Sequence, residues 1–147
     1  MTRPDLIGRI LVAAQFALLA WLIWPLTSQR WSLPALLLVG CAAGLGLWTL
    51  FHNRPGNFNI RPEPKASGRL VMSGPYRFVR NPMYSAVLLF AAAEVVAYAD
   101  PWKISCLLAL ALVLLAKAML EERGLRTHFP GYAEYAKRVR RFIPGVF

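Results

Sequence analysis

Long apolar runs alternate with shorter polar segments along almost the whole chain. Four such runs cover residues 6–26, 33–51, 83–99 and 104–120. Because about 20 apolar residues form a helix long enough to cross the hydrocarbon core of a bilayer, we expect about four transmembrane helices. The pattern therefore predicts an all-α membrane bundle that forms a single domain over residues 1–147.

Prolines and polar residues mark the ends of the expected helices. Pro25 lies in a short turn after the first run, and Pro82 is placed to begin the third helix. Asp100-Pro101 separates the third run from the fourth, so we expect these two helices to form a hairpin with a tight turn. The closing segment, residues 121–147, is expected to leave the membrane as a separate helix followed by a tail.

Composition and charge support a membrane protein with one basic side. The chain is 57% hydrophobic and 16% charged, and its formal net charge is +10. The basic residues lie between and after the apolar runs rather than along one face, which disfavours nucleic acid and favours anionic lipid headgroups as partners. Apart from Arg30 and Lys103, the Lys and Arg residues fall on one predicted side. We therefore place both termini in the cytoplasm, at the inner membrane if the protein is bacterial.

The segment that leads into the third run combines groups suited to an anionic or heterocyclic ligand. Residues 73–84 read Ser-Gly-Pro-Tyr-Arg-Phe-Val-Arg-Asn-Pro-Met-Tyr, with two guanidinium groups and a proline at a helix start. Helix N-termini and Arg favour anionic groups, and Tyr rings can stack on a heterocycle or face a cation. The alternative is a juxtamembrane anchor of Arg and Tyr at the headgroups.

A second polar cluster follows the fourth run. Glu121 and Glu122 are adjacent at a membrane boundary, and aromatic and basic residues follow them to the end of the chain. Such carboxylates are costly there unless they meet cations or a ligand. They could pair with Arg123, Arg126 or Arg80, or they could bind an amine or ribose hydroxyl of a ligand. Because both clusters are predicted on one side, they can bound a single cytoplasmic pocket.

The order and spacing of these motifs resemble the isoprenylcysteine carboxyl methyltransferase family and related membrane phospholipid methyltransferases, in particular the short prokaryotic-type members. The resemblance covers residues 74–147 and rests on Gly-Pro-Tyr, Arg-Asn-Pro-Met-Tyr, Glu-Glu and the Arg-Phe-Ile-Pro tail. It implies S-adenosylmethionine as methyl donor, S-adenosylhomocysteine as product and a lipophilic acceptor that arrives from the bilayer. The cofactor-binding residues that it implies lie in segments 74–84 and 121–144 and are Tyr76, Arg80, Asn81, Pro82, Tyr84, Glu121, Glu122 and Tyr135. Family motifs usually have His where Asn81 stands, so any role that needs a titrating imidazole is excluded at this position.

The chemistry of the acceptor is left open by the residues. A carboxylate acceptor is ionised near neutral pH and needs only a cation to orient it, for which the candidates are Arg54, Arg61, Arg77 and Arg138. An amine acceptor must lose a proton, and Glu122 or Glu94 is then the candidate base. We favour a carboxylate, such as a prenylcysteine-type group, over a phospholipid amine.

Two other classes of function compete with the methyltransferase. A non-enzymatic protein could bind anionic lipid through its basic loop and assemble through the Gly-rich second helix. A small transporter subunit could use Glu94 and Lys117 as polar elements of a pathway. Glu94 alone reads as a hydrogen-bonded core acid near the outer end of its helix, and Lys117 is expected to reach the cytoplasmic interface. No metal site is expected, and the oligomeric state is left open.

Overall fold

The computed structural model describes residues 3–24, 31–53 and 70–147. In the described residues the chain forms five α-helices and one 3-10 turn, and no strand. They are α1 (Arg3–Ile23), α2 (Leu33–Asn53), the 3-10 helix η1 (Gly74–Arg77), α3 (Pro82–Tyr98), α4 (Pro101–His128) and α5 (Tyr132–Arg138). Pro25, Arg30, Arg54 and Arg61, which entered the sequence-based predictions, lie outside the described residues.

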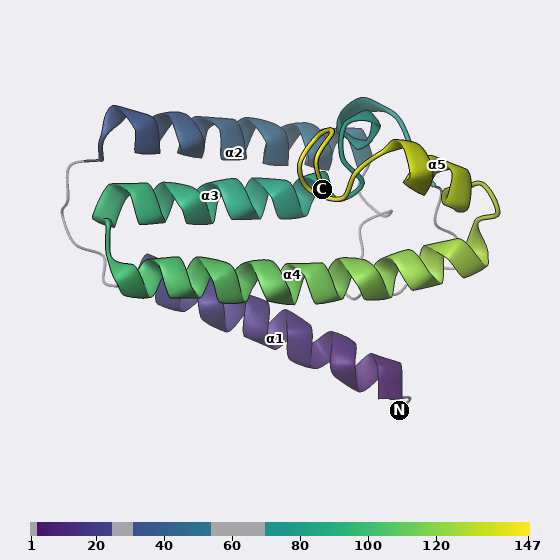
Figure 1. Cartoon of the computed structure of the whole chain (residues 1–147), viewed down its shortest axis with the longest axis horizontal. Helices are drawn as coiled ribbons and strands as arrows, with labels where there is room; N and C mark the ends of the chain where they lie inside the picture. The colour runs from purple at the N-terminus through teal and green to yellow at the C-terminus, as the bar shows by residue number, and fades with distance from the viewer. Residues whose placement is uncertain (1–2, 25–30, 54–69) are drawn as a thin grey trace.

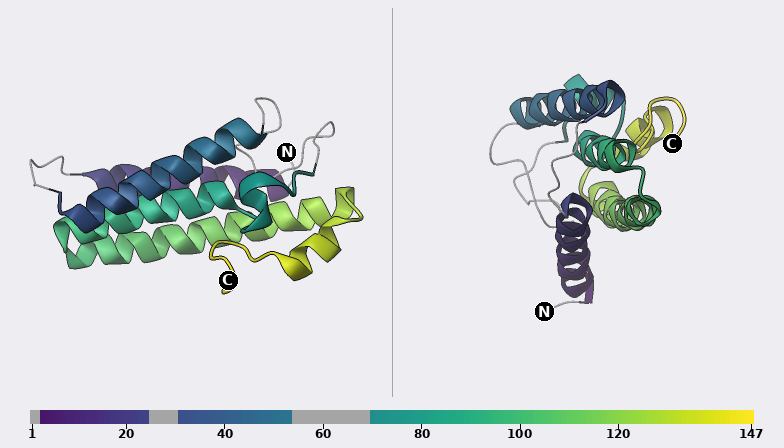
Figure 2. Two further views of the ribbon diagram at one scale, coloured as in Figure 1. Left: turned by 90° about the horizontal axis from the view of Figure 1, so that it is seen from above. Right: turned by 90° about the vertical axis from the view of Figure 1, so that its left-hand side faces the viewer.

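The four long helices run side by side, with α3 between α2 and α4 (Figures 1 and 2). Helix α2 packs along α3, α3 packs on α4, and α1 lies across α4. The buried apolar core is made by one residue of α1, Leu22, with Ala91 of α3 and Cys106, Leu110 and Leu114 of α4. Because the core is narrow, each outer helix keeps an apolar face uncovered, as in a bundle whose outer solvent is lipid.

Three of the helices, α1, α2 and α4, are long and apolar enough to cross a membrane. Helix α3 is apolar but has 17 residues, which correspond to about 26 Å along its axis. It is the shortest of the four helices that were expected to span the membrane. It is also the central helix, packed against α2, α4 and α1. The all-helical membrane bundle predicted from the apolar runs is therefore confirmed.

Helix α4 extends beyond the predicted span, and this changes the place of the acidic pair. The sequence predicted a span that ends at residue 120 and a separate helix from residue 121, but α4 continues without a break to His128. Glu, Arg and Leu are good helix formers, Gly124 is tolerated within the helix, and no proline occurs before Pro130. Glu121 and Glu122 therefore lie on α4 itself, in the part that extends beyond its most apolar stretch.

The helix ends divide the bundle into two ends with different chemistry. At one end α2 ends at Asn53, α3 begins at Pro82 and α4 approaches its end at His128, and η1 and α5 lie beside them (Figure 1). We call this the motif end. At the other, the hairpin end, Ala99 adopts a left-handed conformation (φ 52°) and Asp100 precedes the first turn of α4. The tight turn expected between the third and fourth runs is thus present.

Candidate functional site

A sharp turn places the first motif against α2. Gly74 has φ +59°, and a Cβ at this position would lie 2.6 Å from the His52 ring. The Nε2 atom of His52 and the Oγ atom of Ser73 are hydrogen-bonded at 2.9 Å. Only glycine combines this backbone conformation with such close contact, so Gly74-Pro75 brings η1 back onto the end of α2.

The C-terminal tail then pairs with the residues that begin α3. Val79 and Arg140 form a parallel bridge, and the backbone N–H of Arg80 donates to the carbonyl of Arg140 at 2.7 Å. The N–H of Asn81 donates to the carbonyl of Arg141 at 3.0 Å. The hydroxyl of Ser85, one turn into α3, donates to the carbonyl of Phe142 at 2.7 Å. Segments about 60 residues apart are thereby held together by backbone hydrogen bonds.

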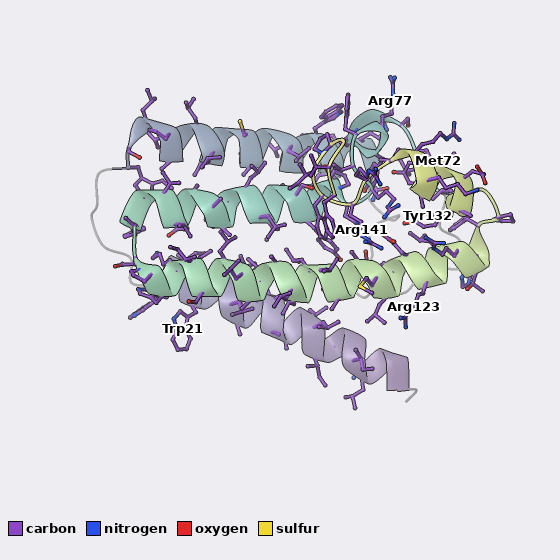
Figure 3. All side chains as sticks on the ribbon, viewed as in Figure 1. Trp21, Met72, Arg77, Arg123, Tyr132 and Arg141 are labelled. Atoms are coloured by element: carbon purple, nitrogen blue, oxygen red, sulfur yellow. The ribbon has the colours of Figure 1, made fainter. Side chains whose placement is uncertain are left out.

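Glu122 joins α4 to both of these segments through two arginines. Glu122 is 3% exposed, and Oε1 of its carboxylate lies 3.0 Å from Nη2 of Arg80. Arg141 binds the same carboxylate with two nitrogens, Nε at 2.9 Å and Nη2 at 3.2 Å. Figure 3 shows Arg141 in the space between α3 and α4. Two guanidinium groups on one carboxylate leave a net positive charge in this cluster, which favours an anionic ligand group.

The short helix α5 closes the cluster from the side. Nη1 of Arg80 donates to the carbonyl of Ala136 at 2.6 Å, and the hydroxyl of Tyr135 donates to the carbonyl of Tyr76 at 2.7 Å. The rings of Tyr132 and Tyr135 pack edge to face. Burial raises the pKa of Tyr76 to about 12 and raises the pKa of Tyr132 and Tyr135 as well. These phenols are therefore neutral at physiological pH and act as hydrogen-bond groups and ring faces.

A second polar contact lies beside the first. The hydroxyl of Tyr84 on α3 donates to Oε1 of Glu121 on α4 at 2.5 Å. The ring of Tyr84 also faces Nζ of Lys117 at 5.1 Å from its centroid. Glu121 and Glu122 are neighbours in sequence but point to different partners, since successive residues on a helix are turned by about 100°.

Two buried nitrogens in this region have no hydrogen-bond partner among the described residues. They are Nδ2 of Asn81 and Nε of Arg80. A buried donor without a partner costs free energy comparable to a lost hydrogen bond, so such donors point to a ligand or solvent group that they can bind. Pro82, which begins α3, is buried beside them.

The structure brings together all eight predicted cofactor-binding residues. Around Glu122 and Glu121 it gathers Tyr76, Arg80, Asn81, Pro82, Tyr84 and Tyr135 from η1, the link between η1 and α3, α3 itself and α5. It does not bring in the predicted catalytic residue Arg138, which is exposed at the end of α5. Arg77 and Arg123 point away from the bundle (Figure 3).

Glu94 lies elsewhere, near the hairpin end. Nζ of Lys103 is 2.8 Å from Oε2 of Glu94 and donates to the carbonyl of Leu22 at 2.7 Å. The same ammonium lies 3.7 Å above the ring of Tyr98. The sequence placed Lys103 on the side opposite most of the basic residues, and the structure places it in the first turn of α4 at the hairpin end, where it is fully buried. The ion pair ties the ends of α1, α3 and α4 together and keeps Glu94 apart from the motif end.

Sequence reasoning missed three polar contacts at the motif end. Arg141 was one of several basic residues after the fourth run, which could not be ranked without the fold, and no role was indicated for His52. Lys117 was expected to reach the interface, but it is 4% exposed and donates to Oε1 of Gln15 at 2.6 Å. Its position inside an apolar run, facing a polar residue in another run, was the signal that could have indicated a buried contact.

Comparison with known proteins gives one relative and one family for this chain. One relative, the cobalt-zinc-cadmium resistance protein CzcN of Cupriavidus metallidurans, is 37% identical over 82 residues. The aligned part is 54% of this chain and 38% of the relative, so the chain spans well under half of that protein's length. The family model for phospholipid methyltransferases matches residues 35–131, which include α2, η1, α3 and α4. The resemblance drawn from the motifs is confirmed, and the chain belongs to the phospholipid methyltransferase family of membrane methyltransferases.

Proposed function

We propose that the protein transfers a methyl group from S-adenosylmethionine to the carboxylate of a lipophilic acceptor in the membrane, with S-adenosylhomocysteine as the second product. The observation that carries this proposal is the convergence of both motifs on Glu121 and Glu122. Four separate segments meet there, and each supplies a polar group of a kind that the cofactor needs.

The residues at the motif end fit this cofactor. The cluster of Arg80, Arg141 and Glu122 has an excess positive charge, which suits the carboxylate of the methionine part. The unpaired amide nitrogen of Asn81 is a donor for the same ligand, and Glu121 can accept from a ribose hydroxyl. The ring of Tyr84 offers a face to a sulfonium cation. When bound, the cofactor supplies an electrophilic methyl group on its sulfur.

The protein's own contribution is positioning and charge. Direct transfer of a methyl group requires the acceptor oxygen to approach in line, so holding both reactants in place can supply most of the acceleration. The phenols of Tyr76 and Tyr135 remain neutral, and the hydrogen bond from the Tyr135 hydroxyl to the carbonyl of Tyr76 holds α5 against η1. Glu122 holds the two arginines, and through them the start of α3 and the tail.

A carboxylate acceptor fits the described acids better than an amine does. An amine must be deprotonated, yet both carboxylate oxygens of Glu122 are already bound by the guanidinium groups of Arg80 and Arg141 and are not free to meet an amine. Glu94 is paired with Lys103 near the other end of the bundle. Glu121 is the remaining carboxylate of the described cluster, and its oxygen already accepts the Tyr84 hydroxyl. A carboxylate acceptor needs none of these groups as a base.

The same arrangement supports a cytoplasmic location for the motif end. The exposed basic side chains around it include Arg77, Arg123, Arg126, Arg138 and Arg140. By the bias of basic residues toward the cytoplasm, this end and both termini would face the cytoplasm, with the basic side chains near anionic headgroups.

Methyl transfer in lipid nanodiscs tests the proposal. The purified protein is given S-adenosylmethionine with a labelled methyl group and either a prenylcysteine derivative with a free carboxyl group or phosphatidylethanolamine. We expect label in the prenylcysteine product and its release as methanol by alkali, because methyl esters are hydrolysed there and methylamines are not. The exposed variant Glu134→Gln serves as control and should behave as the wild type.

Each other result has a defined meaning. Alkali-stable label in phosphatidylethanolamine would replace the carboxylate by the amine acceptor. Absence of both transfer and S-adenosylhomocysteine binding, together with vesicle binding that weakens strongly with salt, would favour a lipid-binding scaffold.

A further inference from the structure

Two buried lysines on α4 differ in how their charges are balanced. Lys103 is fully buried and has a carboxylate partner, Glu94, at 2.8 Å. Lys117 is 4% exposed, and its hydrogen bond goes to the neutral amide of Gln15 at 2.6 Å. In the part of the chain that the structure describes, Lys117 forms no ion pair. The carboxylate of Glu121, one turn further along α4, interacts with the ammonium electrostatically but makes no direct ion pair with it. Buried charges are normally paired directly, so Lys117 is a cation that can still take a carboxylate partner.

Lys117 lies next to the motif-end cluster, on the side that faces the hairpin end. It precedes Glu121 by one helical turn on α4, and its ammonium faces the ring of Tyr84 at 5.1 Å. Lys117 is about 24 Å along the helix axis from Pro101, the first residue of α4. If the hairpin end lies at one boundary of a hydrocarbon core of about 30 Å, the backbone of Lys117 lies about 6 Å inside the other boundary. This is a depth at which the head of a lipophilic acceptor can meet it from within the bilayer.

The contact between Lys117 and Gln15 lies where α1 separates from α4. On the C-terminal side of Gln15, Leu18, Leu19 and Leu22 pack in the core, and Sγ of Cys106 contacts the carbonyl of Leu18. On the N-terminal side, Leu6, Ile7 and Ile10 are exposed and Leu11 is half-buried. Figures 1 and 2 show α1 diverging from α4 toward its N-terminus. The ammonium is therefore covered at a fork that opens toward the surrounding lipid.

We propose that Lys117 binds the carboxylate of the lipophilic acceptor, which reaches it laterally through the fork between α1 and α4 and displaces the amide of Gln15. This inference rests on the proposed methyltransferase function and adds the residue that selects an acid. An ammonium has three donors, and a carboxylate adds the attraction of an opposite charge, which the neutral amide of Gln15 lacks. When the acceptor carboxylate replaces the Gln15 amide as the hydrogen-bond partner of Lys117, it therefore compensates the buried charge. It also places the acceptor oxygen next to Tyr84.

A binding assay that needs no methyl transfer tests this role. The full-length protein is placed in phosphatidylcholine nanodiscs with a photoreactive long-chain fatty acid or with its methyl ester, and the half-saturating amount is measured by crosslinking. We expect the wild type to prefer the acid by about tenfold to a hundredfold, the range for hydrogen bonds with a charged group. Crosslinks should fall on α1 and α4. An equal affinity for acid and ester would overturn the proposal.

Variants with matched charge changes separate Lys117 from the general positive charge. Lys117→Met should lose the preference for the acid, and Lys117→Arg should keep most of it. Lys137→Met removes one exposed charge near the motif end and should leave the preference unchanged. Retention of the preference in Lys117→Met would contradict the role of Lys117. If that variant does not fold, Gln15→Leu decides, because removal of the competing amide should tighten binding of the acid, and unchanged or weaker binding would contradict the displacement.

Two further arms distinguish the possible sources of an anion and the two proposals. Phosphatidylglycerol added to the nanodiscs should not displace the fatty acid, and displacement as strong as by unlabelled palmitate would assign the site to a headgroup phosphate instead. Binding of S-adenosylhomocysteine is measured on the same samples. Its absence in the wild type contradicts the proposed function, whereas its presence without a preference for the acid contradicts only the role of Lys117.

Discussion

Replacement of Glu122 by Gln tests whether this residue holds the motif end together. The carboxylate is buried and binds Arg80 at 3.0 Å and Arg141 at 2.9 and 3.2 Å. Glu122→Gln keeps the shape but removes the charge, so two guanidinium groups face each other without an anion between them. Removal of one partner of a buried ion pair costs about 3–5 kcal/mol. The side chain of Arg141 is 28% exposed and its charge is partly screened, so we expect about 3 kcal/mol.

Thermal unfolding in detergent measures this effect. At about 2–4 °C per kcal/mol, the unfolding midpoint of Glu122→Gln should fall by about 6–12 °C. The tail should also become accessible to protease, because Arg141 no longer fixes it to α4. The control is Glu134→Gln, whose exposed ion pair with Lys137 contributes under about 1 kcal/mol. Equal midpoints for the two variants would refute the role assigned to Glu122.

Three further results are expected. Lys103→Met or Glu94→Gln alone should lower the unfolding midpoint strongly. The double variant Lys103→Met/Glu94→Leu should recover part of the loss, because it leaves no unpaired charge in the bilayer, and no recovery would contradict the pairing. Gly74→Ala should destabilise by about 1–2 kcal/mol from its φ of +59°, with a further cost from contact with the His52 ring that His52→Ala relieves; a stable Gly74→Ala protein would contradict the close turn. Burial raises the pKa of Tyr76 to about 12 from the usual value near 10, so its contribution to stability is complete below pH 10 and is lost as the pH rises through 12. An alkaline titration of phenolate absorbance should lose a late-titrating group in Tyr76→Phe, and titration of that group near pH 10 in the wild type would contradict the burial.

The membrane architecture was predictable from the sequence because it depends on the lengths of apolar runs. The starts of α2 and α3 were predicted to within one residue by Leu33 and Pro82, since a proline begins a helix through its own backbone geometry. The end of α4 was not predicted, because charged residues such as Glu122 continue a helix as readily as they follow one. The apolar pattern marks the region buried in lipid and not the full length of the helix.

The composition of the site was largely predictable, but its pairings were not. The motifs predicted that Glu122 and Arg80 belong to one region, and the structure pairs them at 3.0 Å. The second partner, Arg141, was one of several arginines in the tail, and its choice depends on the backbone pairing between the tail and the start of α3. The partners of Lys103 and Lys117 were not indicated by the sequence, and only the fold shows that one meets a carboxylate and the other an amide.

The most direct test of the central claim is isothermal titration of S-adenosylhomocysteine into the purified wild type, with Tyr84→Phe and Glu134→Gln beside it. Tyr84→Phe removes the hydroxyl that donates to Glu121 while keeping the ring, so the fold should be retained and the affinity should fall about tenfold. Glu134→Gln should bind as the wild type does. Saturable binding that weakens only in Tyr84→Phe is the predicted result, and a folded wild-type protein that binds no S-adenosylhomocysteine would contradict the account.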